Sequence, residues 1–316
     1  MEHIVYLDRE AIQRPIPVPN FAHDWVEYPN TPPELVLERL RPATIALTNK
    51  VRIRSEVIAQ LPLLRFICVT ATGTDCVDLA ACRERSIMVS NVQNWCSIPV
   101  AEHTLALIFT LRRQLIALRE QVQAGAWHRA GNYCVYPPTH PPNLFGSTLG
   151  IIGHGTLGQR VAALGQGLGM KVLLAERKNA ETIRPGRVSF ERVLAESDVI
   201  SLHCPLTPQT RHVIAASELA LMKPSALLIN TARGGLVDPQ ALVTALQNHT
   251  IGGAGIDVLE VEPPVDSNPL LDVTLPNLLV TPHIAWLSAE SLETMVLQIT
   301  NNLEHFIAGN PTNVVA

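Results

Sequence analysis

The stretch Leu149-Gly-Ile-Ile-Gly-His-Gly-Thr-Leu-Gly158 decides the fold that this sequence predicts. Its first four residues form an apolar run typical of a buried parallel strand, and helical apolar spacing follows its last glycine. Gly153, Gly155 and Gly158 occupy the turn between the two elements. Glycines at these places permit a tight turn, a close approach of the backbone to an anion, and close packing of the helix on the strand. The stretch therefore predicts a strand–turn–helix unit that binds phosphate groups.

An acidic residue follows this unit at the distance expected for a dinucleotide-binding fold. Glu176 lies at the end of the apolar run Lys171–Ala175, roughly 20 residues beyond the last glycine. An acid there accepts hydrogen bonds from the adenosine ribose hydroxyls, which favours NAD. Arg177 and Lys178 come next, and they either bind a 2′-phosphate, which would favour NADP, or are simply solvated. We expect a dinucleotide cofactor, with NAD favoured and NADP possible.

Composition excludes several classes of protein. The chain has 316 residues, of which 47% are hydrophobic, so it can bury about two domain cores and is not a disordered chain. A net charge of −4 argues against a nucleic-acid partner bound by bulk electrostatics. Aromatic residues make up only 4%, as is common in helix-covered parallel sheets.

The cysteines and the apolar runs indicate the cellular compartment in which we expect the protein. None of the 6 cysteines forms a CxxC pair or a zinc-type cluster with histidine, which favours free thiols in a reducing compartment and no metal site. Residues 1–10 do not resemble a signal peptide, and no apolar run approaches the roughly 18 residues of a membrane span. We expect a cytoplasmic protein with no membrane partner.

Short apolar runs alternate with helical stretches along most of the chain, which predicts an α/β fold with two doubly wound parallel sheets. In the first part, strands are expected at Ile4–Leu7, Thr44–Leu47, Phe66–Thr70 and Ile87–Val89. In the second part, they are expected at Gly150–Gly153, Val172–Ala175, Val199–His203, Ala226–Asn230, Ala254–Val258 and Leu278–Thr281.

Two longer helices are expected outside this alternation. One runs from Ser97 to about Ala124, with Pro99 in its first turn and Gly125 at its end. It is either a spine or dimer interface or a plain core helix, and the pattern does not separate these. The other, Ser288–Ala308, is amphipathic and is expected to pack back on the first domain.

Three ionisable residues follow predicted strands, at the edge where open α/β sheets bind ligands. They are Arg233, Glu262 and His283. Arginine grips a carboxylate with two parallel hydrogen bonds, histidine exchanges a proton near neutral pH, and a carboxylate beside histidine orients it. Each residue alone could be a solvated loop charge. Together they predict a site that binds a 2-oxo acid, protonates its carbonyl oxygen and leaves C2 open to a hydride.

With these motifs the chain resembles the D-isomer-specific 2-hydroxyacid dehydrogenase family, and within it the glycerate dehydrogenase/hydroxypyruvate reductase branch. The matching segments, in the family's order, are 72–79, 97–108, 146–158, 203–214, 222–238, 252–264 and 281–286. Cys76, where many members have Asn, and Glu176, where Asp is more usual, depart from the pattern. The resemblance implies an oxidoreductase that transfers a hydride between NAD(P)H and a small 2-oxo acid, with hydroxypyruvate or glyoxylate favoured, and gives the D-2-hydroxy acid.

The resemblance also implies residue roles. Arg233 would bind the substrate carboxylate, His283 would be the acid/base, and Glu262 would be its partner. Further substrate contacts would be Thr72, Gly73 and Thr74, through backbone amides, and Trp286, which is equally explained as hinge packing. Cofactor contacts, besides the three glycines and residues 176–178, would be His154, Thr156 and Leu157 at the pyrophosphate, Cys204 and Pro205 at the adenosine, Asp257 at the nicotinamide, and Thr231 and Ala232.

The domain organisation that the resemblance implies is discontinuous. Residues 1–97 plus 287–316 would form a flavodoxin-like substrate-binding domain, and 98–286 a Rossmann-like dinucleotide-binding domain, with a cleft between them and a homodimer as the assembly. Two other functions stay open. One is a cofactor-sensing, co-repressor-like protein with little turnover, and the other is a dehydrogenase of a different small anion such as phosphite.

Overall fold

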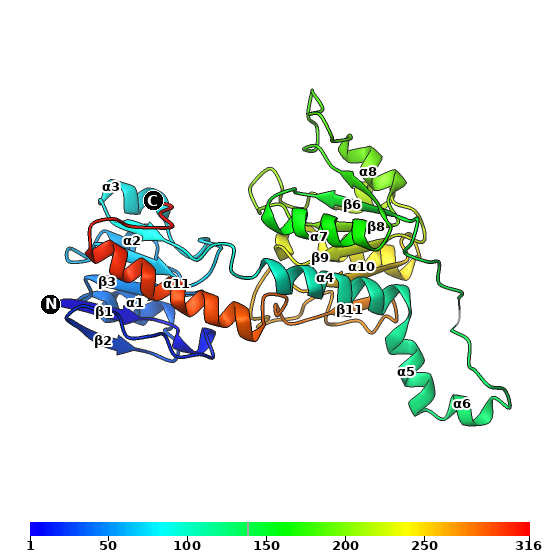
Figure 1. Ribbon diagram of the computed structural model, residues 1–316, viewed down its shortest axis with the longest axis horizontal. Coiled ribbons are helices and arrows are strands. Elements are labelled where there is room, and N and C mark those ends of the chain that lie inside the picture. Colours follow the sequence, from blue (N-terminus) through cyan, green and yellow to red (C-terminus); the bar gives the residue numbers. More distant parts are fainter. Residues whose placement is uncertain (138) are drawn as a thin grey trace. The chain divides into compact units, whose positions relative to one another are not determined.

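The computed structural model describes residues 1–137 and 139–316 (Figure 1). The chain divides into two compact units, Met1–Cys96 with Ser288–Ala316, and Ser97–Leu287. Each unit is built on one wholly parallel sheet, and the α/β class with two such sheets is confirmed. The roles of the two units in binding substrate and cofactor stay a prediction.

The first sheet has five strands in the order β2-β1-β3-β4-β5. Their bounds are β1 Glu2–Tyr6, β2 His23–Glu27, β3 Ile45–Thr48, β4 Phe66–Val69 and β5 Met88–Ser90. This is the flavodoxin-like order. The edge strand β2 is absent from the sequence prediction, because its residues HDWVE are polar and only half-buried.

Short helices connect these strands, and one long helix comes from the other end of the chain. They are η1 Arg9–Ala11, η2 Pro33–Leu35, α1 Val36–Leu40, α2 Ser55–Ile58, α3 Leu79–Glu84 and α11 Ala289–Ile307. Met295, Ile299 and Leu303 of α11 are buried against the first sheet. Phe306 stacks on Phe66 of β4 with ring centroids 4.3 Å apart. The C-terminal segment then pairs with β5, where the backbone N–H of Val315 donates to the Val89 carbonyl.

The second sheet has six strands in the order β11-β10-β9-β8-β6-β7. Their bounds are β6 Thr148–Ile152, β7 Lys171–Leu174, β8 Val199–Leu202, β9 Leu227–Asn230, β10 Gly253–Ile256 and β11 Leu278–Val280. Beyond β7, a single parallel bridge joins Ala175 to Val188. This bridge takes the place of the third strand of a Rossmann sheet, so the strand order reverses at β6.

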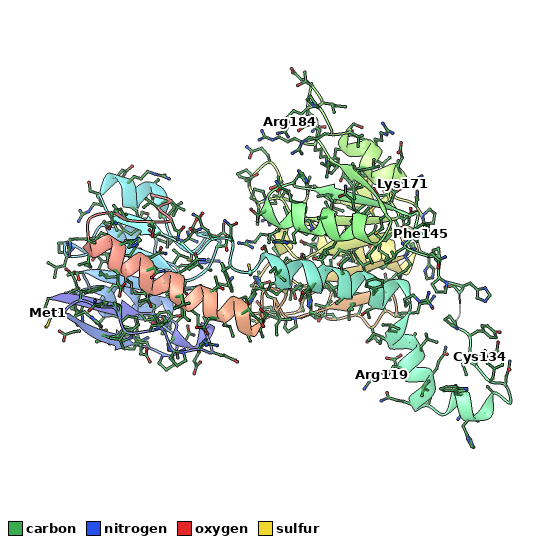
Figure 2. All side chains as sticks on the ribbon, in the orientation of Figure 1. Met1, Arg119, Cys134, Phe145, Lys171 and Arg184 are labelled. Carbon is green, nitrogen blue, oxygen red and sulfur yellow. The ribbon has the colours of Figure 1, made fainter. Side chains whose placement is uncertain are left out.

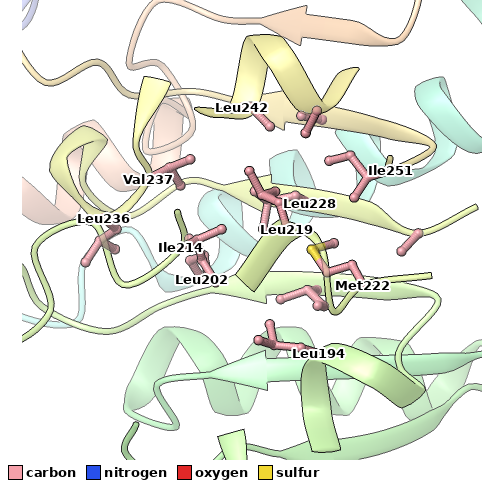
Figure 3. Close-up of a cluster of buried hydrophobic side chains, with 14 of the residues drawn as sticks. Leu194, Leu202, Ile214, Leu219, Met222, Leu228, Leu236, Val237, Leu242 and Ile251 are labelled. Atoms are coloured by element: carbon pink, nitrogen blue, oxygen red, sulfur yellow. The ribbon is translucent and has the colours of Figure 1, made fainter. Parts of the chain in front are cut away.

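Helices cover both faces of the second sheet. They are α4 Ser97–Arg112, α7 Thr156–Gly167, α8 Phe190–Glu196, α9 Ala216–Leu219, η3 Gly234–Leu236 and α10 Pro239–Gln247. One core includes Leu194 of α8, Leu219 of α9 and Leu242 of α10 packed on the sheet (Figure 3). A second core includes Leu107 of α4 and Val161 of α7, and Figure 1 shows these two helices side by side. All six strands of this sheet were expected from the sequence.

The prediction of one helix from Ser97 to Ala124 is wrong. The chain forms α4, turns at Gln114 in the left-handed conformation with φ 51°, and continues as α5 Leu115–Gln123 and α6 Ala126–Arg129. The side chain of Gln114 donates to the Thr139 hydroxyl at 2.8 Å. α4 packs on the sheet, whereas α5 buries no residue. The apolar spacing runs through both helices, but only α4 is covered by the rest of its unit.

Within the described residues, no helix is both long enough and apolar enough to cross a bilayer.

Candidate active site

Three neighbouring strands of the second sheet deliver the predicted catalytic residues to one edge. Register pairs Ile256, the last residue of β10, with Asn230, the last of β9, and with Val280, the last of β11. Arg233 follows β9 by three positions and His283 follows β11 by three, while Glu262 lies in the loop after β10. Since all the strands are parallel, these three loops leave the same edge of the sheet side by side.

His283 and Glu262 form a direct pair. Nδ1 of His283 lies 2.5 Å from Oε2 of Glu262, and the other carboxylate oxygen accepts the backbone N–H of Leu259 at 2.8 Å. Each of the paired side chains is 27% exposed. Because a carboxylate only accepts hydrogen bonds, Nδ1 carries the proton and Nε2 is left to exchange a proton with a ligand.

The backbone of His283 is held in an uncommon conformation. Its φ is 51°, in the left-handed region that non-glycine residues rarely occupy. Its N–H donates to the Asp257 carbonyl at 2.7 Å and lies 3.0 Å from the Thr281 carbonyl, and its own carbonyl accepts Nε1–H of Trp286 at 2.8 Å. The turn therefore fixes the direction in which the imidazole leaves the backbone.

Asp257 organises this turn. The residue is 1% exposed, and its carboxylate accepts the Thr281 hydroxyl at 2.6 Å and the backbone N–H groups of Ile284 at 3.0 Å and Ala285 at 2.9 Å. The predicted contact of Asp257 with a nicotinamide stays a prediction. The contacts that the structure shows are structural and support the His283 turn.

His103 of α4 is a residue that sequence reasoning missed. Its Nε2 lies 3.0 Å from the Thr281 hydroxyl and 3.5 Å from Oδ1 of Asp257. His103 thus supports the same turn from the helix that covers the sheet. Nothing in its spacing links it to a residue 178 positions away, so only the packing of α4 reveals it.

The loop that carries Arg233 is shaped by a buried amide and a glycine. Asn230 is fully buried; its Nδ2 donates to the Arg233 carbonyl at 2.9 Å, and its Oδ1 accepts the N–H of Ala232 at 3.1 Å. A Cβ added to Gly234 would lie 2.0 Å from the Leu259 carbonyl carbon. Glycine at this place lets the Arg233 loop pack directly on the loop that leads to Glu262.

The glycine turn after β6 fits a bound dinucleotide. A Cβ on Gly158 would lie 2.1 Å from the Gly153 carbonyl oxygen, so helix α7 needs glycine to approach the turn. A Cβ on Gly155 would meet nothing within 4 Å, so the backbone there is open to a ligand. The N–H groups of Thr156, Leu157 and Gly158 begin α7 and have no partner within that helix, as an anion site requires.

The remaining predicted cofactor contacts surround this turn. His154 lies within it, and Cys204 and Pro205 follow the neighbouring strand β8, where a Cβ on Gly153 would lie 2.3 Å from the Cys204 nitrogen. Burial raises the pKa of the Cys204 thiol to about 11, so the thiol stays neutral. Thr231 and Ala232 follow β9, and the Thr231 hydroxyl lies 3.1 Å from that of Thr104.

The carboxylate of Glu176, which follows β7, already accepts hydrogen bonds from other groups of this chain. It is 4% exposed, and Arg184 donates to it from Nε at 2.7 Å and from Nη2 at 2.5 Å. These hydrogen bonds, with that from the Arg177 backbone N–H, lower the pKa of the carboxyl well below its ordinary value. The Lys178 ammonium lies 2.9 Å from a Glu218 oxygen, and the Arg177 side chain is exposed. Arg184 was not identified from the sequence.

The predicted Thr72–Thr74 loop belongs to the first unit and follows β4. The Thr72 hydroxyl accepts Nε1–H of Trp95 at 2.9 Å, and its carbonyl accepts Nδ2–H of Asn91 at 2.7 Å. The hydroxyl and carbonyl are thus engaged, and the loop is fixed from within its own unit. Among the residues that the structure describes, no group of three or more histidine, cysteine, aspartate or glutamate side chains could hold a metal ion.

Comparison with known proteins places the chain in a family. A model described as the D-isomer specific 2-hydroxyacid dehydrogenase NAD binding domain matches residues 105–285. Glycerate dehydrogenase of Methylorubrum extorquens is 47% identical over 314 residues, which cover 99% of this chain and 98% of that protein.

Solved structures agree over the whole chain. An acyclic imino acid reductase in complex with NADPH and D-Arg is similar with a TM-score of 0.84 and 31% identity, covering 99% of this chain and 100% of that one. An NADPH-dependent glyoxylate/hydroxypyruvate reductase of Sinorhizobium meliloti has a TM-score of 0.83 and 26% identity, covering 100% and 98%. Its motifs, its two parallel sheets and these likenesses together mean that the chain belongs to the D-isomer-specific 2-hydroxyacid dehydrogenase family and is an enzyme with an NAD-binding domain.

Proposed function

We propose that this enzyme reduces a small 2-oxo acid, with hydroxypyruvate and glyoxylate as the favoured substrates, to the D-2-hydroxy acid with NAD(P)H. The observation that carries the proposal is the His283–Glu262 pair, at 2.5 Å, on the ligand-binding edge of the sheet that also carries the glycine turn. The names of the related glycerate dehydrogenase and glyoxylate/hydroxypyruvate reductase support the choice of substrates.

The pair supplies the proton chemistry. With Nδ1 held by Glu262, Nε2 of a protonated His283 donates to the carbonyl oxygen of the substrate as that oxygen gains electron density. The Glu262 carboxylate stabilises the imidazolium before the transfer and keeps the ring from rotating. In the reverse direction, the neutral ring accepts the proton of the 2-hydroxy group at the same atom.

Arg233 binds and orients the substrate. Its guanidinium offers two parallel hydrogen bonds to the C1 carboxylate, which places C2 and its oxygen in a defined position. The backbone N–H groups of Thr72, Gly73 and Thr74 give further donors to that carboxylate. Trp286, whose Nε1–H is bound to the His283 carbonyl, provides apolar surface beside the reacting atoms and limits the entry of water.

The cofactor is held along the same edge. The N–H groups at the start of α7 and the open backbone at Gly155 bind the pyrophosphate, with His154 beside them. Cys204 and Pro205 line the adenosine side, and Thr231, Ala232 and Asp257 lie toward the nicotinamide side. When bound, the reduced nicotinamide supplies the hydride that C2 receives.

A substrate screen tests this proposal. The enzyme is mixed with NADH or NADPH and with glyoxylate, hydroxypyruvate, pyruvate or bulkier 2-oxo acids, and the loss of reduced-nicotinamide absorbance is followed. We expect the highest kcat/KM with hydroxypyruvate or glyoxylate. Cofactor binding without turnover of any 2-oxo acid would favour a sensor protein instead, and turnover of phosphite alone with an oxidised nicotinamide would favour the other dehydrogenase.

We also propose that the enzyme is a cytoplasmic homodimer that associates through α5, α6 and the segment after them. Large apolar side chains there are exposed, namely Leu115, Ile116, Val122, Trp127, Tyr133 and Tyr136. Figure 1 shows α5 and α6 extending away from the second sheet. Such a patch is typical of a protein interface. The six free cysteines support a reducing compartment.

Light scattering tests the dimer. The wild-type enzyme is expected to have twice the mass of one chain, and Val122→Glu, which places a charge within the patch, is expected to shift it toward the monomer. Val18→Glu, at an exposed apolar position outside the patch, is the matched control and should leave the mass unchanged. A monomeric wild-type enzyme would contradict the proposal.

A further inference from the structure

Helix α4 brings two consecutive polar residues to the ends of strands that carry the proposed site. Gly255 of β10 allows the helix to approach, because a Cβ there would already lie 3.0 Å from an α4 side chain. The Thr104 hydroxyl lies 3.1 Å from that of Thr231, after β9. His103, beside Thr104, reaches Thr281 after β11. Figure 1 shows α4 along the second sheet, and Figure 2 draws its side chains.

Counting protons gives the direction of each hydrogen bond in this contact. The Asp257 carboxylate is 1% exposed and lies 2.6 Å from the Thr281 hydroxyl. It also accepts the backbone N–H groups of Ile284 at 3.0 Å and Ala285 at 2.9 Å. An ionised carboxylate only accepts, so the single proton of the Thr281 hydroxyl points to Asp257. The Thr281 oxygen therefore accepts its other hydrogen bond, at 3.0 Å, from Nε2–H of His103.

The two histidines around this turn thus hold their protons on opposite nitrogens. Neutral His103 carries its proton on Nε2 and directs it to Thr281, whereas His283 carries its proton on Nδ1 and directs it to Glu262. Nε2 of His103 also lies 3.5 Å from Oδ1 of Asp257. Because this nitrogen is already committed to the turn, His103 donates a hydrogen bond there and does not exchange a proton with a ligand.

The end of this hydrogen-bond chain holds the backbone of His283 from both sides. The Asp257 carbonyl accepts the His283 N–H at 2.7 Å, and the Asp257 carboxylate accepts the next two N–H groups along the chain. The φ of His283 is 51°, a conformation that persists only where the surroundings impose it. A hydroxyl that accepts a hydrogen bond donates more strongly in turn, so His103 strengthens the hold of Thr281 on Asp257.

We infer that His103 is a positioning residue for the reaction, acting on His283 through Thr281 and Asp257. Its N–H keeps the Asp257 carboxylate in the orientation that imposes the His283 turn, and the turn keeps the imidazole on Glu262. The inference rests on the proposed function, because an effect on the rate presupposes that His283 is the acid. It assigns a part in the reaction to a residue of the covering helix.

Kinetics of two substitutions at one position test the donor. His103→Leu removes the N–H, and we expect kcat to fall by roughly tenfold, the value of about one neutral hydrogen bond. KM for the 2-oxo acid should be unchanged. His103→Gln, whose side-chain amide can replace Nε2–H, should restore kcat. Glu102→Gln, at the exposed neighbour on α4, is the matched control and should leave kcat unchanged.

A double-mutant cycle tests the route through the hydroxyl. Thr281→Val breaks the same chain at its middle, so we expect a loss of kcat at least as large as that of His103→Leu. Adding His103→Leu to Thr281→Val should then cost little more, because the two residues act as a unit. Losses that multiply in the double variant would overturn the inference. If His103→Leu does not fold, Thr281→Val and His103→Gln still test it.

Amide hydrogen exchange, read by mass spectrometry without substrate or cofactor, tests the turn itself. Residues 281–287 should exchange faster in His103→Leu than in wild type and return to the wild-type rate in His103→Gln. Residues 148–158, at the glycine turn, serve as the internal control and should not change.

The outcomes separate this inference from the proposed function. Wild-type kcat in His103→Leu, equal losses in His103→Leu and His103→Gln, or unchanged exchange at residues 281–287 in His103→Leu would each overturn the inference and leave the function standing. A wild-type enzyme that turns over no 2-oxo acid would instead contradict the proposed function, and the exchange measurement would still decide whether His103 holds the turn.

Discussion

Two glutamates follow strands of the same sheet, and they differ in what holds them. Glu262 follows β10 and is 27% exposed, and it holds an imidazole whose proton can leave. Glu176 follows β7 and is 4% exposed, and it is held by a guanidinium that stays charged at any pH relevant to proteins. In the proposed mechanism, the Glu262 carboxylate therefore assists proton transfer, whereas the Glu176 carboxylate stays paired with a fixed positive charge.

The strand order explains how one edge of the sheet can hold two glutamates with such different partners. β10 and β7 are separated in the sheet by β9, β8 and β6, so in the proposed mechanism the two glutamates lie toward opposite ends of the bound cofactor. Arg233 after β9 lies beside the proton-transfer end, and the glycine turn after β6 lies beside the charge-setting end. We therefore expect substitutions after β10 and substitutions after β7 to have separate effects on the reaction.

The largest expected effect is the loss of the proton donor. His283→Ala should lower kcat by roughly two to four orders of magnitude, because general acid catalysis contributes about that much. Binding of NADH, measured by fluorescence titration, should be unchanged. His128→Ala, at an exposed histidine of α6, is the control and should keep full activity. Activity retained in His283→Ala would assign the proton to another group.

The second-largest effect is expected from replacing Arg233, the residue proposed to bind the substrate carboxylate. Arg233→Lys keeps the positive charge but loses the planar fork, so kcat/KM for the 2-oxo acid should fall by roughly tenfold to a hundredfold. Steady-state kinetics with saturating cofactor measures this. Unchanged kinetics would mean that the substrate carboxylate is bound elsewhere.

A smaller effect is expected at the partner of His283. Glu262→Gln retains an acceptor for Nδ1–H but removes the charge that stabilises the imidazolium, so kcat should fall by about tenfold, as expected for the loss of part of a charged hydrogen bond. Glu260→Gln, an acid nearby whose partner is Arg211, is the matched control. Equal kcat values for Glu262→Gln and Glu260→Gln would show that the charge of Glu262 does not assist His283.

The smallest expected effect concerns stability at acid pH. The pKa of Glu176 is lowered by the hydrogen bonds from Arg184, so the folded state binds this proton less readily than the unfolded chain, whose carboxyl keeps a pKa near 4.5. This contribution is present above that pH and is lost as the pH falls below it. Thermal melts should show that wild type has a higher Tm than Glu176→Gln near neutral pH, and that this difference in Tm shrinks as the pH is lowered. A difference in Tm that grows as the pH is lowered would contradict the assignment of the Glu176–Arg184 ion pair.

Much of the fold could be predicted because it obeys local rules, whereas the roles of the site residues stay a prediction. The glycine turn, all six strands of its sheet and the three proposed catalytic residues lie in runs with clear apolar patterns or motif spacing. β2 could not be found, since a polar edge strand carries no such pattern. Nor could the break at Gln114, where apolar spacing continues while the surroundings change.

The partners of predicted residues were harder to predict than the residues themselves. Arg184 lies in a loop without periodicity, so its fork on Glu176 follows only from the fold of that loop. His103 reaches the His283 turn because α4 packs on the sheet, which is a long-range contact. Sequence motifs indicate which groups do chemistry, but packing decides what charge and direction those groups have.

Isotope transfer tests the central claim most directly. The enzyme reduces hydroxypyruvate with a nicotinamide that carries deuterium on the transferable C4 position, and the product is analysed by mass spectrometry and chiral chromatography. We predict D-glycerate with deuterium bound to C2. Glycerate without deuterium, glycerate of the L configuration, or no glycerate while both cofactor and substrate are bound would contradict the account.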